Sequence, residues 1–115
     1  MKALDYNLVM KRTDKFYEAY SAFCQTVTNP IRLKIIESLG SDKLNVSELQ
    51  EKVEVSMSNL SNHLSPLYKL GVLDREKKGN FTYYFLADGE ILDIILKMGG
   101  FMDKINQLKH NDLNG

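Results

Sequence analysis

Apolar residues recur at helical spacing near the start of the chain. Phe16, Tyr20 and Phe23 lie three or four residues apart. This spacing predicts a helix over about residues 5–25, with an irregular start around Thr13.

The next predicted helix has a clear beginning and end. Asn29 can cap it with its side chain, and Pro30 suits the first helical position, where no N–H is needed. Ile35 and Leu39 belong to its apolar face, and Gly40 ends it.

A short third helix is predicted from a capping pattern. Val46 adds an extended residue, and Ser47 then stands three residues before Gln50, which is the spacing of a capping box. The helix should therefore run from Ser47 to about Val53.

A fourth helix is predicted over about residues 57–70. Ser56 can cap it, and Gly71 supplies a left-handed stop. Pro66 removes one hydrogen bond inside this helix, so we expect a bend or a weakened last turn. One side of the helix is apolar and carries Met57, Leu60, Leu64, Leu67 and Leu70.

The pattern then changes from helical to extended. Residues 72–77 and 81–86 are β-type runs. Between them, Lys78, Gly79 and Asn80 tolerate a tight turn. The two runs therefore predict a β-hairpin.

A last helix is predicted over about residues 89–110, with apolar residues on more than one side. Gly99 and Gly100 interrupt this pattern, so we expect a kink or a close helix crossing there.

Two short helices followed by a hairpin, in a mainly α chain of five helices, are the plan of a winged helix-turn-helix. The side of the fourth helix opposite the leucines is polar, and its hydroxyl and amide groups suit base edges and phosphates in the DNA major groove. The hairpin wing, about residues 74–85, has a basic tip that suits a phosphate or a minor groove. The candidate DNA-binding residues are Ser56, Ser58, Asn59, Ser61, Asn62, His63, Lys77, Lys78 and Asn80.

Several segments also match a known pattern in order and spacing. Ser61, His63 and Leu64 form a Ser-x-His-Leu core, which resembles the recognition helix of the ArsR/SmtB family of transcriptional regulators. The matching segments are residues 29–36 with Leu39, 55–64, 67–73 and 79–85. Pro66 departs from the family pattern.

The resemblance implies a homodimer that binds double-stranded operator DNA and represses transcription. In this family the terminal helices form the dimer interface, which here means about residues 5–25 and 89–110. For His63 the resemblance implies a phosphate contact, while a partly buried capping role stays open.

The resemblance also bears on an effector. One regulatory metal site of the family uses a Cys-x-Cys pair, but the matching residues here are Asn45 and Ser47, which are not thiolate ligands. Another needs an Asp-x-His start in the last helix, and here Ile95 follows Asp93 at that spacing. We therefore expect no metal and no cofactor. An unknown small-molecule or protein effector, or no effector, stays open.

Composition and charge place limits on these interpretations. A length of 115 residues predicts one domain over 1–115, and the single cysteine, Cys24, excludes an intrachain disulfide. No signal-peptide pattern or membrane-spanning run is visible, so we expect a soluble cytoplasmic protein with no membrane partner. The net charge of 0 argues against a nucleic-acid partner. However, residues 55–87 carry four basic and two acidic side chains, a net charge of +2.

Two other classes of function compete with DNA binding. A winged helix can serve as a protein-interaction module without specific DNA binding, which a neutral chain would permit. An enzyme is disfavoured, because no glycine-rich phosphate loop is present and Cys24 and His63 lie on separate predicted helices without a third member of a triad.

Overall fold

The computed structural model describes residues 11–114, and its first helix is α2 (Asp14–Val27). Thr13 caps this helix, because its side-chain oxygen accepts the N–H of Phe16 at 3.2 Å. The helix expected over about residues 5–25 therefore begins after Thr13 and continues to Val27. The part of that prediction over residues 5–10 lies outside the described residues.

Helix α3 (Pro30–Leu39) has the expected bounds. The side chain of Asn29 accepts the N–H groups of Ile31 and Arg32, and Gly40 follows the helix with a φ of 54°, which glycine adopts without steric cost.

Helix α4 (Val46–Val53) begins earlier than expected, after the two-residue strand β1 (Leu44–Asn45). The predicted cap, Ser47, is wrong, and Val46 is helical rather than extended. Asn45 accepts the N–H of Glu48 at 2.9 Å, and the Glu48 carboxylate accepts the N–H of Asn45 at 3.0 Å. The sequence contains two overlapping capping-box spacings, Asn45 to Glu48 and Ser47 to Gln50. Only the first leaves residues 44–45 extended, so that they pair with strand β3 (Phe81–Leu86).

Helix α5 (Met57–Leu70) is continuous through Pro66. Ser56 caps its start, and the N–H groups of Gly71 and Val72 close its end on the carbonyls of Tyr68 and Leu67. The expected weakening is thus offset at the helix end. Pro66 has no N–H to donate to the carbonyl of Asn62, four residues earlier. Asn62 is exposed, so water can bind this carbonyl.

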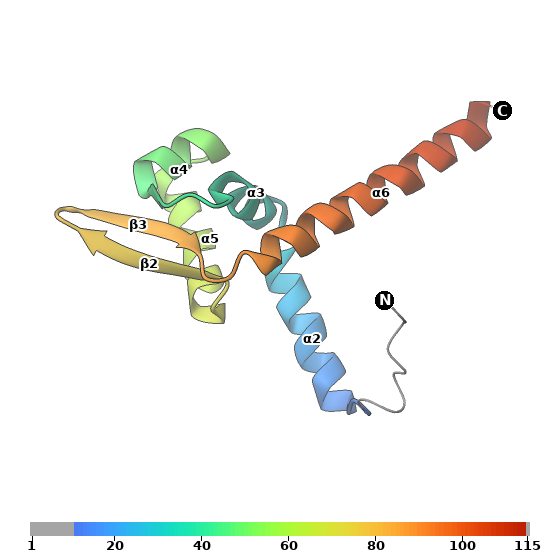
Figure 1. The fold of residues 1–115 in the computed structure, drawn as a ribbon, viewed down its shortest axis with the longest axis horizontal. Helices are drawn as coiled ribbons and strands as arrows, with labels where there is room; N and C mark the ends of the chain where they lie inside the picture. Colours follow the sequence, from blue (N-terminus) through green and yellow to red (C-terminus); the bar gives the residue numbers. More distant parts are fainter. Residues whose placement is uncertain (1–10, 115) are drawn as a thin grey trace.

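The hairpin has a tighter turn than expected. Strand β2 (Leu73–Lys78) includes Lys78, so only Gly79 and Asn80 form the turn before β3. Gly79 has a φ of 61°, which a two-residue hairpin turn requires at its first position. The three antiparallel strands lie in the order β1-β3-β2. The β2–β3 hairpin extends away from the helices (Figure 1).

Helix α6 (Glu90–Asn114) continues without interruption across Gly99 and Gly100, and the kink or close helix crossing expected there stays a prediction. Each glycine costs a helix roughly 1 kcal/mol relative to alanine, which the hydrogen bonds of the long flanking segments outweigh. A Cβ added at either glycine meets nothing within 4 Å in one copy of the chain.

The buried core lies where α3, α4, α5 and β2 meet. Its fully buried side chains are Ile35, Ile36, Leu39, Leu49, Leu60, Leu67 and Leu73. Helices α2 and α6 extend away from this core in different directions (Figure 1). The radius of gyration is accordingly 17.5 Å, against about 13 Å for an ordinary domain of this length. None of the helices among residues 11–114 is long and apolar enough to span a bilayer.

Candidate nucleic-acid interface

Helix α5 has one buried side and one exposed polar side. Leu60, Leu64 and Leu67 are buried against the core. Ser61 and Asn62 are exposed on the opposite side. Because the leucines fix the rotation of α5 about its axis, short polar side chains face solvent along a helix that can enter a DNA groove.

The beginning of α5 offers further polar groups. The Ser56 side chain accepts the N–H of Asn59 at 3.1 Å, and its hydroxyl lies 3.4 Å from that of Ser58. Ser56 and Ser58 are exposed, whereas Asn59 is half-buried. A helix N-terminus with exposed hydroxyls suits phosphate oxygens.

His63 is half-buried and joins three helices. Its Nδ1 accepts a hydrogen bond from Nε of Arg32 at 3.2 Å, and Nη1 of Arg32 donates to the carbonyl of Thr26 at 2.9 Å. Burial and the neighbouring Arg32 guanidinium lower the pKa of His63. A neutral ring whose Nδ1 accepts carries its proton on Nε2, so Nε2 is the nitrogen left to donate to a phosphate.

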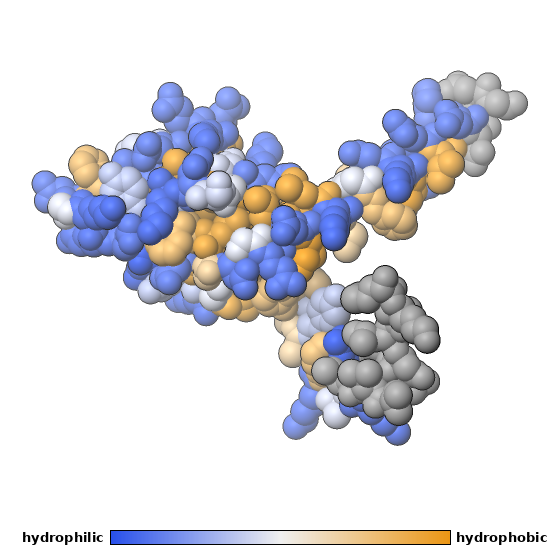
Figure 2. Space-filling model, viewed as in Figure 1, coloured by the Kyte–Doolittle hydropathy of each residue, from blue (hydrophilic) through white to orange (hydrophobic). Residues whose placement is uncertain are grey.

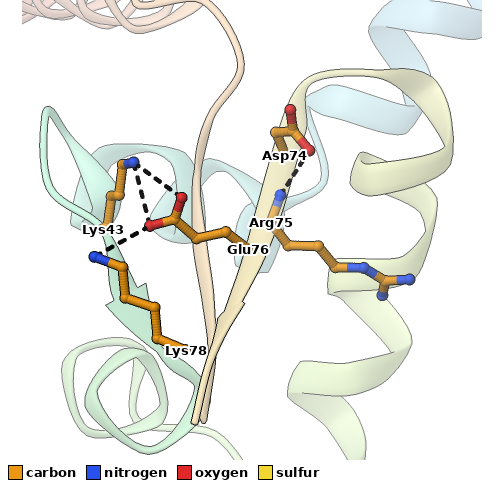
Figure 3. Close-up of polar contacts among 5 residues, drawn as sticks. All are labelled: Lys43, Asp74, Arg75, Glu76 and Lys78. Carbon is orange, nitrogen blue, oxygen red and sulfur yellow. Dashed lines mark hydrogen bonds and ion pairs between the residues drawn. The ribbon is translucent and has the colours of Figure 1, made fainter.

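The two basic residues at the wing tip lie on opposite faces of the hairpin. Successive side chains of a strand alternate, so Lys77 shares the face of Arg75 and Leu73, while Lys78 shares that of Glu76. Glu76 lies 3.7 Å from Lys78 and 3.3 Å from Lys43 (Figure 3). Lys78 therefore has its charge partly compensated. Asn80 is exposed in the turn.

Arg75 also lies at this candidate interface, although it is not among the residues predicted from the sequence. Its guanidinium points towards α5, away from Glu76 and Lys78 (Figure 3). The guanidinium carbon lies 4.0 Å from the centre of the Tyr68 ring, and Nη1 lies 3.4 Å from the hydroxyl of Tyr84. Strand alternation from Leu73 could have placed Arg75 on the α5 side, but the sequence does not show which aromatic residues receive it.

A groove of about 220 Å³ separates α5 from the wing. Its lining residues are Val46, Ser61, Leu64, Ser65, Tyr68, Lys69, Arg75 and Tyr84. Thus the exposed side of α5 and the wing face that carries Arg75 belong to one continuous surface.

No metal centre is apparent in the described part of the chain, which contains no group of three or more His, Cys, Asp or Glu residues able to hold an ion. Asn45, at one position where the family pattern has a thiolate, is the cap of α4.

The helix pair α4 and α5 followed by the β2–β3 hairpin defines the chain as a winged helix-turn-helix protein. The model of a family described as "Bacterial regulatory protein, arsR family" matches residues 29–75. Two relatives are named regulators. CadC, the cadmium resistance transcriptional regulatory protein of Listeria innocua, is 36% identical over 76 residues, which make up 65% of this chain and 64% of CadC. The transcriptional repressor SdpR of Bacillus subtilis is 29% identical over 80 residues, or 70% of this chain and 89% of SdpR.

A third relative has a known structure. The uncharacterized HTH-type transcriptional regulator Rv0081 of Mycobacterium tuberculosis is 30% identical over 84 residues, which cover 72% of this chain and 74% of Rv0081. Its crystal structure matches with a TM-score of 0.77 and 26% identity, over 84% of this chain and 98% of that one. The chain belongs to the ArsR family of bacterial regulatory proteins.

Proposed function

We propose that this chain is a homodimeric regulator that binds specific sequences of double-stranded DNA and represses transcription. One observation supports this above all. The exposed polar side of α5 lies beside a wing whose near face carries Arg75 and Lys77, so a helix and its flanking cations present a single surface. SdpR, a relative over 70% of the chain, is named as a repressor.

In this proposal the side chains of α5 read bases. Asn62 is exposed and can bind an adenine edge with two hydrogen bonds, and the Ser61 hydroxyl can donate to or accept from a base edge. Ser56 and Ser58 bind phosphate at the start of the helix, together with Nε2 of His63. Asn59 lies next to these phosphate-binding residues on α5 and belongs to the same DNA-binding surface. At the wing tip, the DNA backbone is contacted by Lys77, Lys78 and Asn80.

The homodimer is inferred from the two helices that extend from the core. Along α6, exposed apolar residues recur at alternating spacings of four and three, which is the repeat of a helix that packs against another helix. They are Ile94, Met98, Phe101, Ile105 and Leu108, and Met98 is 66% exposed. We call these five residues the α6 stripe.

Helix α2 has a similar set of exposed aromatic residues, Phe16, Tyr20 and Phe23. Figure 2 shows apolar surface along the side of α6 that faces α2. A monomer gains nothing by leaving these faces in water, whereas a symmetric pair of chains would bury them. Such a dimer would present two α5 helices about 34 Å apart, one turn of DNA.

A DNA partner would place the protein in the cytoplasm.

The competing proposal, a winged helix that binds only another protein, predicts a different response to salt. A dimer that contacts about six or more phosphates should lose roughly a thousandfold in affinity between about 50 and 200 mM salt. We would measure this by fluorescence anisotropy of a labelled duplex. A folded dimer that binds no duplex at low salt would contradict DNA binding and favour the protein-interaction module.

A further inference from the structure

Arg75 lies between two acidic neighbours in the sequence, yet neither pairs with its guanidinium. The carboxylate of Asp74 accepts the backbone N–H of Arg75 at 2.8 Å. Glu76 lies on the opposite face of β2 and pairs with Lys43 and Lys78 (Figure 3). Within the described part of the chain, no ion pair includes Arg75. Its positive charge is therefore available to an external anion.

Two tyrosines hold the guanidinium in place. The ring of Tyr68 stacks at 4.0 Å from the guanidinium carbon, and the Tyr84 hydroxyl accepts one hydrogen bond at 3.4 Å. A guanidinium has five N–H donors, so most of the fork stays free after this bond is made. Because Arg75 is fixed by aromatic groups rather than by a carboxylate, its orientation is set without neutralising its charge.

The groove around Arg75 has the character of an anion site. Two of its lining residues, Arg75 and Lys69, are cationic, and none is acidic. Ser61 and Ser65 add hydroxyl donors on the α5 side. Helix α5 in a major groove and the wing beside the adjacent minor groove would require the intervening sugar-phosphate strand to cross this groove.

We propose that Arg75 binds a backbone phosphate of the DNA strand that passes between α5 and the wing, and that Tyr68 and Tyr84 position its guanidinium for that contact. This inference rests on the proposed function, since it specifies how the same surface holds DNA. The ligand is a phosphodiester of a duplex. Its contact with Arg75 would position the protein on the DNA and add affinity, but it would not distinguish one base from another.

The test compares two variants that each remove one positive charge from β2. Arg75→Ala should weaken binding to every duplex by about tenfold or more and reduce the slope of log affinity against log salt by about 1. Lys78→Ala is the comparison variant. Lys78 also contacts the DNA backbone in the proposed function, but Glu76 partly compensates its charge on the other face of β2, so its loss should change both quantities less. Because Arg75 is exposed, its replacement should leave the fold intact. An unchanged circular dichroism spectrum of the variant would establish this.

A second comparison tests the positioning. Arg75→Lys keeps the charge but loses the planar fork, and Tyr84→Phe keeps the ring but removes the acceptor of its hydrogen bond. Arg75→Lys should restore less than half of the decrease in log affinity that Arg75→Ala causes. Tyr84→Phe should weaken binding without changing the slope of log affinity against log salt. Parental affinity in Arg75→Lys would overturn the role of the held fork.

Single neutral methylphosphonates, placed in turn along the duplex, identify the phosphate. One position should weaken binding by the parent but not by Arg75→Ala. If no such position exists, or if Arg75→Ala binds like the parent with the same salt slope, the assignment of Arg75 is overturned while DNA binding stands. If the parent itself binds no duplex at low salt, the proposed function fails first.

Discussion

At the scale of single residues, the proposed function divides the polar side of α5 into groups that read bases and groups that bind phosphate. Asn62 belongs to the first group because its amide is exposed at the middle of the helix. Asn62→Ala should therefore lose about 1–3 kcal/mol of binding free energy on the cognate operator. Competition anisotropy would measure this loss, and a scrambled duplex should bind as before. Equal affinity of parent and variant for the operator would place the base-reading face elsewhere.

The wing lysines provide a second residue-scale prediction. Lys77 shares the face of Arg75, whereas Lys78 lies on the opposite face near Glu76. Lys77→Ala should weaken all duplexes alike and reduce the salt slope by about 1, as expected for the loss of a phosphate contact. Lys78→Ala should have the smaller effect. Equal effects of the two variants in a salt titration would show that the faces of the hairpin do not determine the contact.

His63 makes stability depend on pH. Its pKa is lowered in the folded chain, and its Nδ1 can accept from Arg32 only while the ring is neutral. The neutral form therefore adds stability at pH values above the ordinary pKa of about 6.5, and this contribution is lost as the pH falls through the lower folded value.

His63→Gln supplies a non-titrating acceptor at the same place. Between pH 7.5 and 5, the melting temperature of this variant should fall less than that of the parent. Parallel melting curves for the two proteins across that range would contradict the account of the Arg32–His63 hydrogen bond.

At the scale of elements, α6 carries the strongest indication of a partner copy. Phe101 is 59% exposed at the centre of the α6 stripe. Phe101→Glu would place a charge in an apolar interface twice in a symmetric dimer, at a cost of several kcal/mol. Sedimentation at micromolar concentration should show a monomer.

Gln107 provides the control for this change. It lies roughly half a turn from the α6 stripe at about 100° per residue, so Gln107→Glu adds a similar negative charge outside the stripe. This variant should stay dimeric. A Phe101→Glu variant with the parental mass would exclude the stripe as the interface.

At the scale of the whole molecule, local rules account for most of the fold. The caps Asn29 and Ser56, the stop at Gly71 and the turn at Gly79 were predictable because each depends only on neighbouring residues. The cap of α4 was predicted wrongly because two capping-box spacings overlap, and the choice depends on the pairing of β1 with a strand about 40 residues away.

The sequence predicts the candidate site in outline but not its details. The polar side of α5 follows from helical periodicity, so its serines and Asn62 could be selected from the sequence. Strand alternation could have placed Arg75 on the α5 side, but the sequence does not show that Tyr68 and Tyr84 hold its guanidinium. The hydrogen bond between His63 and Arg32 joins residues 31 positions apart, which no local pattern reveals.

The most direct test of sequence-specific DNA binding is a competition measurement. A labelled duplex from the region upstream of the protein's own coding sequence would be bound by the purified protein, then challenged with the same duplex or with a scrambled one. We predict tight binding that the unlabelled cognate duplex displaces and the scrambled duplex does not. Equal displacement by both duplexes, or no binding at low salt by the folded dimer, would contradict the account.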